Sequence, residues 1–235
     1  TVLNTSAQGP VKNLGNVKTF KAGDQAVTFT TDNGYVNIIV YSPSIFRVRA
    51  DKQKLKEDFS YAVVTKPVKT NVQVSSDEKQ VVIKTDSLKA IVQKNPFSIS
   101  FYTHDNKLIS TDETGLTTSW VNEEVTTYKT MQEGEKFIGL GEKTGNLNRR
   151  NQGYTNWNTD AYGYDPYADP LYTSIPFYMG IHHGLNYGIF LDNTFQTDFN
   201  FGASNNRFSS FGARGGEMNY YFIYHTKMAD IIGSY

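Results

Sequence analysis

Short runs in which apolar and polar residues alternate recur along this chain and restrict it to a β-rich fold. Between residues 27 and 50, for example, Val36, Ile38 and Val40 lie on one face of an extended chain, as the period of two in a strand requires. The Asp-Asn pair at 105–106 indicates the turn of a hairpin. Similar runs occur at 61–64, 72–74, 81–85, 88–92, 97–102, 108–110, 175–181, 187–192, 197–201, 207–211 and 219–223. Short strands at this spacing predict an all-β fold, namely an antiparallel β-sandwich.

The end of the chain has the period of a helix instead. Apolar residues there are spaced i, i+3, i+4 and i+7, at Met228, Ile231, Ile232 and Tyr235. Thr226 precedes them as a candidate N-cap. We therefore expect a short C-terminal helix. Because its apolar face is still in use at the last residue, we also expect the sequence to stop at a domain boundary of a longer protein.

Length and composition bound the organisation and the partners. We expect the 235 residues to form one domain, 1–235, with the start of a linker helix at 227–235. Lys plus Arg and Asp plus Glu are 23 each, so no charge excess points to nucleic acid or a charged membrane surface. No apolar run approaches the ~18 residues of a membrane span, and the polar segment 1–8 lacks the features of a signal peptide.

The absence of cysteine excludes some kinds of site. With no cysteine in the chain, disulfides, thiolate metal sites and a Cys nucleophile are ruled out, and the compartment, including the periplasm or the exterior, is left open. We expect no cofactor and no metal site.

A long segment without periodicity, 144–172, indicates a functional loop. Disordered segments are poor in aromatic residues, whereas this one is rich in them. Aromatic faces cover the apolar face of a pyranose, and carboxylates accept hydrogen bonds from its hydroxyl groups, so the composition favours sugar binding. The residues concerned are Tyr154, Trp157, Tyr162, Tyr164, Tyr167 and Tyr172, with Asp160, Asp165 and Asp169.

Asp160 is the carboxylate in this loop that best fits a contact with sugar. It is the last residue of Trp157-Asn158-Thr159-Asp160, so the indole of Trp157 offers a stacking surface close in sequence to the carboxylate, which accepts hydrogen bonds. The alternative from these residues alone is an Asx-turn or a solvated charge.

Three other motifs have structural readings that compete with functional ones. Gly139 to Gly145 superficially resembles a phosphate-binding loop, but its glycine spacing is wrong and no long helix follows. A corner of the sheet is favoured instead, and Glu142 could be buried beside it. Asp192 ends a strand run and favours a turn. His182 and His183 with Glu217 could move a proton on a sugar ring or bind a metal, but a following Gly favours a hairpin tip.

Five blocks of sequence, taken together with their order and spacing, resemble the N-terminal portion of glycoside hydrolase family 31. They are Phe137-Ile-Gly-Leu-Gly-Glu-Lys-Thr-Gly-Asn-Leu-Asn-Arg-Arg150, Trp157-Asn-Thr-Asp160, Asp169-Pro-Leu-Tyr-Thr-Ser-Ile-Pro-Phe-Tyr178, Tyr187-Gly-Ile-Phe-Leu-Asp-Asn193 and Gly215-Gly-Glu-Met-Asn-Tyr-Tyr-Phe222. The upstream run Ile45-Phe46-Arg47-Val48-Arg49 resembles the same region more loosely. The resemblance covers nearly the whole chain.

The resemblance implies a galactose-mutarotase-like β-sandwich that precedes a (β/α)8 catalytic barrel in a retaining α-glucosidase or α-xylosidase acting on an oligosaccharide or α-glycoside. It places both catalytic carboxylates in the barrel, so no residue of this chain receives a catalytic role and the chain alone is expected to be inactive. It assigns substrate contact near the scissile bond to Asp160, with Trp157 and Asn158 shaping the loop. It leaves Glu142, Asp192 and Glu217 as scaffold.

Three other functions remain open from the sequence. The same aromatic residues would suit a free-standing carbohydrate-binding module. His182 or His183 with Glu217 would suit a mutarotase-like sugar epimerase. A sandwich that packs on the barrel and touches no sugar would need none of these residues.

Overall fold

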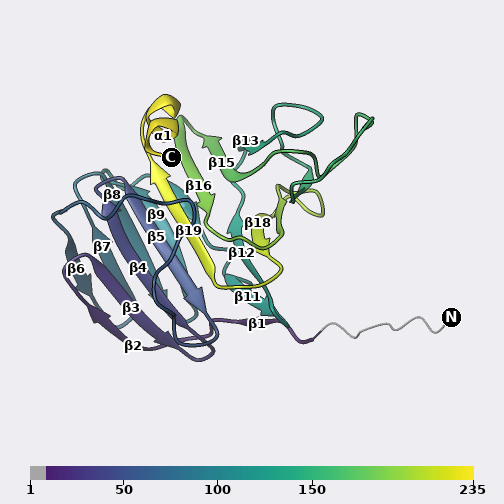
Figure 1. The fold of residues 1–235 in the computed structure, drawn as a ribbon. Helices are drawn as coiled ribbons and strands as arrows, with labels where there is room; N and C mark the ends of the chain where they lie inside the picture. Colours follow the sequence, from purple (N-terminus) through teal and green to yellow (C-terminus); the bar gives the residue numbers. More distant parts are fainter. Residues whose placement is uncertain (1–8) are drawn as a thin grey trace.

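The computed structural model describes residues 9–235, and antiparallel strands make up most of it (Figure 1). The polar segment 1–8, in which we expected no signal peptide, lies outside the described residues. Within the described part the strands form three sheets, of eight, six and five strands. The predicted all-β class and the β-sandwich are therefore confirmed.

The largest sheet joins strands from both ends of the chain. Its order is β13 (Lys136–Gly141), β15 (Ser174–His182), β16 (Leu185–Leu191), β19 (Met218–Tyr224), β5 (Ile45–Asp51), β4 (Tyr35–Ser42), β3 (Ala26–Thr31) and β2 (Val17–Ala22). The register of β19 against β5, with Phe222 opposite Phe46, connects the two parts. In β4, Val36, Ile38 and Val40 are buried, as the alternation predicted.

The two smaller sheets lie against one face of the large sheet. The five-stranded sheet has the order β10 (Leu108–Thr111), β9 (Phe97–Thr103), β8 (Leu88–Lys94), β7 (Gln80–Lys84) and β6 (Gln73–Ser76). The six-stranded sheet has the order β1 (Lys12–Asn13), β11 (Thr118–Val121), β12 (Glu124–Thr130), β18 (Phe208–Ala213), β17 (Thr197–Asn200) and β14 (Gly153–Asn156).

One hydrophobic core draws on all three sheets. Phe101 of β9 stacks on Phe222 of β19 with 3.9 Å between ring centroids, and Phe137 of β13 stacks on Phe201 at 4.5 Å. Stacked aromatic pairs of this kind add to the stabilisation from area burial alone. The core thus fixes the large sheet, including β13 and β15, which flank the long loop.

The secondary structure departs from the sequence prediction in several places. Residues 61–64, predicted as a strand, pair with no strand. Six of the described strands were not predicted, namely β1, β2, β11, β12, β13 and β14, the last of which lies inside the predicted loop 144–172. Strand β12 was missed because its inward residues include Thr127 and Lys129, so it lacks apolar alternation. Lys129 is buried because its Nζ lies 2.6 Å from Asp112 Oδ1, which is buried with it.

The predicted C-terminal helix is present as α1 (Met228–Ser234). Its N-cap is Lys227, with no side-chain capping hydrogen bond, so the predicted cap at Thr226 is wrong. Ile231 is fully buried, in a cluster on the outer face of the large sheet with Phe177 and Phe190. No helix in residues 9–235 is long and apolar enough to cross a membrane.

Candidate functional site

The long loop leaves the large sheet at a corner formed by two glycines. Gly139 and Gly141 have φ of 137° and 77°, and a register shift between them marks a bulge against β15. A Cβ on Gly139 would lie 2.5 Å from Phe177 O, and one on Gly141 2.6 Å from Thr173 O. Only glycine fits such backbone contacts. The predicted sheet corner is confirmed, and the phosphate-loop interpretation is wrong.

A buried lysine ties the beginning of the loop to its end. Lys143 Nζ donates to Asp169 Oδ1 and to Thr155 O, each at 2.6 Å, and its side chain is fully buried. Asp169 Oδ2 accepts the backbone N–H of Thr155 at 2.6 Å. We call these three residues the clamp. Because one ion pair and two backbone contacts meet at one point, strand β14 and both ends of the loop are held together.

Two further contacts close the neck of the loop beyond the clamp. The N–H of Thr159 donates to Leu171 O, and the N–H of Ser174 donates to Asn158 Oδ1, both at 2.9 Å. The Asn158 side chain therefore positions the loop. Residues 160–170 project beyond this neck, on the side of β13 and β15 (Figure 1, teal to green).

Aromatic residues of the loop, both before the neck and in the projecting part, face solvent. Tyr162 is 96% exposed, Tyr167 91% and Trp157 52%. The rings of Tyr164 and Tyr172 lie 6.4 Å apart at 63°. Loss of hydration, then the charges of Asp160 and Glu142, raise the pKa of the Tyr172 phenol, so these groups share one patch of surface.

The three aspartates of the loop have different surroundings. Asp169 belongs to the clamp, and Asp165 Oδ1 accepts the N–H of Tyr167 at 2.7 Å in an Asx-turn. Asp160 is exposed and makes no hydrogen bond or ion pair within residues 9–235. Its carboxylate is therefore available for a ligand.

His182 and His183 do not lie beside Glu217, so these residues form no site together. His183 and Gly184 have φ of 47° and 74° and form the two-residue turn between β15 and β16, so the predicted hairpin tip is confirmed. His182 Nε2 lies 2.7 Å from Ile109 O, and burial lowers its pKa. Glu217 precedes β19, at the opposite end of the sheet, and pairs with Arg49. Between residues 9 and 235 no group of three or more His, Asp or Glu side chains could hold a metal ion.

Comparisons with known proteins show which sequences and folds this chain resembles. The profile of the glycosyl hydrolase 31 N-terminal galactose mutarotase-like domain matches residues 35–200. Alpha-glucosidase 2 of Bacillus thermoamyloliquefaciens is 33% identical over 225 residues, which cover 94% of this chain and 28% of that protein. An alpha-xylosidase of Lactiplantibacillus pentosus is 26% identical over 170 residues, 70% of this chain and 21% of that protein.

A solved structure shows the same likeness. The glycoside hydrolase family 31 dextranase of Flavobacterium johnsoniae, solved with isomaltotriose, superposes with a TM-score of 0.88 at 34% identity. The match covers 95% of this chain and 28% of the dextranase chain. This chain thus spans less than a third of each of these relatives.

Proposed function

Since the chain belongs to the glycosyl hydrolase 31 N-terminal galactose mutarotase-like domains, we propose that it is the N-terminal β-sandwich of a retaining α-glycosidase of the α-glucosidase or α-xylosidase type. In this proposal residues 1–235 form one domain, loop 144–172 faces the substrate, and 227–235 begin a linker helix to a (β/α)8 barrel. The barrel supplies both catalytic carboxylates and cleaves the glycosidic bond.

The observation that carries the proposal is that the Asp160 carboxylate is exposed and without a partner within residues 9–235. Asp160 follows a neck closed by one backbone–backbone hydrogen bond and one bond to the Asn158 side chain, and it lies three residues after Trp157. A carboxylate that accepts sugar hydroxyl groups forms charge-assisted hydrogen bonds, each contributing about 1.5–3 kcal/mol. Bonds of this kind that strengthen as the glycosidic bond breaks would raise the rate and not only the affinity.

The aromatic residues supply the second part of the contact. Tyr162, Tyr167 and Trp157 present open ring faces on the same loop. Ring faces pack against the apolar C–H surface of a pyranose, whereas the carboxylate binds its hydroxyl groups. The substrate is therefore a neutral oligosaccharide or α-glycoside. The dextranase relative was solved with isomaltotriose, which belongs to this class.

The test is the hydrolysis of aryl α-glucosides and α-xylosides by the longer polypeptide that carries this domain ahead of its barrel. We expect Asp160→Ala to lower kcat/KM by about 10²-fold, which corresponds to about 2.7 kcal/mol of transition-state binding. Asp165→Ala is the matched control, because Asp165 lies in the same loop but its carboxylate serves a local turn. We expect that variant to retain kcat/KM within about threefold.

Two results would contradict the proposal. An active enzyme with unchanged kcat/KM in Asp160→Ala would reduce this domain to scaffold. A longer polypeptide without glycosidase activity would favour the binding-module alternative, which the exposed tyrosines also suit.

A further inference from the structure

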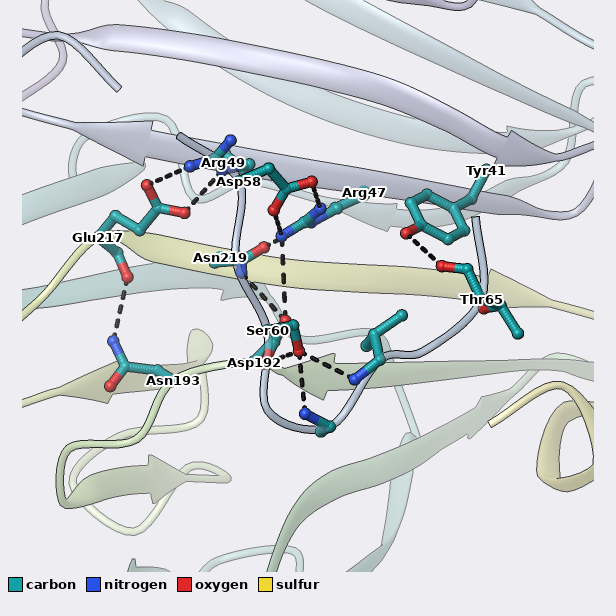
Figure 2. Close-up of polar contacts among 12 residues, drawn as sticks. Tyr41, Arg47, Arg49, Asp58, Ser60, Thr65, Asp192, Asn193, Glu217 and Asn219 are labelled. Atoms are coloured by element: carbon teal, nitrogen blue, oxygen red, sulfur yellow. Dashed lines mark hydrogen bonds and ion pairs between the residues drawn. The ribbon is translucent and has the colours of Figure 1, made fainter. Parts of the chain in front are cut away.

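The segment that links β5 to β6 lies against the outer face of the large sheet as a strap, residues 58–68, which bends at 61–62 (Figure 2). It forms no strand pairing. Tyr41 anchors its far end, since the Tyr41 hydroxyl donates to Thr65 O at 3.1 Å and the N–H of Val68 donates to Tyr41 O at 2.9 Å.

Two polar side chains at the start of the strap, Asp58 and Ser60, are bound by side chains of the sheet and its edge. Arg47, almost fully buried on β5, holds Asp58 through two hydrogen bonds of 2.6 and 2.8 Å and also donates to Asn219 at 2.9 Å (Figure 2). The Ser60 hydroxyl donates to Asp192 Oδ1 at 3.0 Å. A buried guanidinium without an acceptor costs several kcal/mol, so Arg47 and Asp192 dictate which side chains of the strap turn inward.

Four apolar side chains of the strap consequently face outward, whereas Val63 packs inward against the cluster of Phe177 and Phe190 on the sheet. Phe59 is 69% exposed, Tyr61 80%, Val64 91% and Val68 54%. A solvated surface segment shows the opposite arrangement, with polar side chains outward. Contiguous exposed apolar residues of this kind mark an interaction site.

The same surface continues onto the C-terminal helix. A groove of about 470 Å³ lies between the strap and the end of α1, lined on one side by Val63 and Val64 and on the other by Tyr235. On the helix, Met228, Ile232 and Tyr235 are exposed. Strap and helix thus form one apolar surface on the outer face of the sheet.

We propose that this surface, the strap with the exposed side of α1, is where the catalytic domain of the same polypeptide packs. This inference rests on the proposed function. Four of the seven exposed apolar side chains of this surface, Val64, Val68, Met228 and Ile232, offer a sugar neither a ring face nor a hydrogen bond, so a protein surface fits the whole area better than a carbohydrate. The chain spans only 28% of alpha-glucosidase 2, so most of such a protein is available to cover it. Interfaces between domains of one chain bury about 600–1,500 Å².

The test compares a double substitution, Tyr61→Ser with Val64→Ser, in this chain and in the longer polypeptide. Both side chains are at least 80% exposed here, so we expect the Tm of the 235-residue chain to change by less than about 1 °C. In the longer polypeptide we expect the Tm to fall by about 4 °C or more, because the side chains are buried against the barrel. Val11→Ser is the control, since Val11 is 60% exposed but precedes β1, away from the strap.

Hydrogen exchange supplies a readout that does not need the variants. We expect amides 59–66 to exchange at least about tenfold more slowly in the longer polypeptide than in the 235-residue chain. Equal exchange, or an equal Tm change in the two contexts, would overturn the proposal. A dimer of the 235-residue chain that the double substitution dissociates would assign the surface to a second copy instead. Failure here is distinct from failure at the loop, because Asp160→Ala is read out in kcat/KM and this test in stability.

Discussion

At the scale of single residues, Glu135 is the carboxyl group whose surroundings change its chemistry most. It is buried beside β13, where Oε1 accepts the Tyr187 hydroxyl at 2.7 Å and Oε2 accepts the N–H of Gln132 at 2.8 Å. Burial raises its pKa to about 7, against the lowering effect of these two hydrogen bonds. Between pH 4.5 and about 7, the folded chain therefore carries a proton on Glu135 that the unfolded chain has lost.

This shift predicts a pH dependence of stability with a definite sign. The contribution of protonated Glu135 is fully present below the unfolded pKa of 4.5 and is lost as the pH rises to about 7, a loss of up to about 3 kcal/mol. Glu135→Gln cannot titrate, so its unfolding free energy relative to the parent chain should increase between pH 5 and pH 8. Denaturant unfolding at both pH values measures this.

Glu133→Gln serves as the comparison for that experiment. Glu133 lies two residues away but is exposed, so we expect its variant to follow the parent chain at both pH values. If Glu135→Gln also runs parallel to the parent, the carboxyl group is ionised in the folded chain at pH 5 and the argument from burial is wrong.

At the scale of elements, the clamp of Lys143, Thr155 and Asp169 determines where the loop sits. Breaking a buried ion pair leaves an uncompensated charge, so Lys143→Met should free both ends of the loop. We expect amides 157–171 to exchange at least about tenfold faster in this variant. Hydrogen exchange followed by mass spectrometry resolves the segment.

An exposed ion pair gives the matched control for the clamp. Lys18 and Asp32 lie 3.6 Å apart with side chains 58% and 40% exposed. Such pairs contribute about 0–1 kcal/mol, so Lys18→Met should leave the exchange of the loop unchanged. Unchanged exchange in Lys143→Met as well would mean that the neck at Thr159 and Leu171 is sufficient.

How far the sequence predicts an element depends on which residues its inner face carries. Strand β4 was predicted because its inward residues are valine and isoleucine. Strand β12 was missed because Lys129 points inward to Asp112, a partner that local alternation cannot reveal. Residues 61–64 of the strap were mistaken for a strand because Tyr61 to Val64 is an apolar run, but side-chain contacts such as Ser60 to Asp192, and not strand pairing, hold this segment on the sheet.

The same limit applies to the candidate site. The composition of 144–172 and the word Trp-Asn-Thr-Asp were sufficient to single out Asp160, whose contact with substrate stays a prediction. The clamp was not foreseen, because Lys143 and Asp169 are 26 residues apart and a buried lysine looks like any surface lysine in a sequence. A glycine corner just before Lys143 was the available signal that the chain turns there.

At the scale of the whole molecule, the outer face of the large sheet has an apolar half and a charged half. Helix α1 covers the apolar half around Phe177 and Phe190, and the strap covers the charged half around Arg47. Both coverings leave apolar side chains exposed on their far sides. Together with a loop that projects past β13, these are the surfaces that the proposed packing on a catalytic domain would use.

This arrangement predicts that the 235-residue chain binds sugar weakly by itself. Asp160 and the rings of Tyr162 and Tyr167 all lie on one loop, and both rings are more than 90% exposed, so little within residues 9–235 packs against them. Small-molecule sites bury most of their ligand in a concave pocket, and a one-sided contact loses most of that burial. We expect titration calorimetry with isomaltotriose to give a Kd weaker than about 1 mM, or about −4 kcal/mol.

The opposite result would be equally informative. A Kd near 10 μM that Trp157→Ala weakens would show that the loop is a complete binding site, as in a free-standing carbohydrate-binding module. In that case the loop would need no barrel, and Asp160→Ala would weaken sugar binding by the 235-residue chain itself. Weak binding by the chain combined with an Asp160-dependent kcat/KM in the longer polypeptide requires instead that the second wall of the site belongs to the catalytic domain.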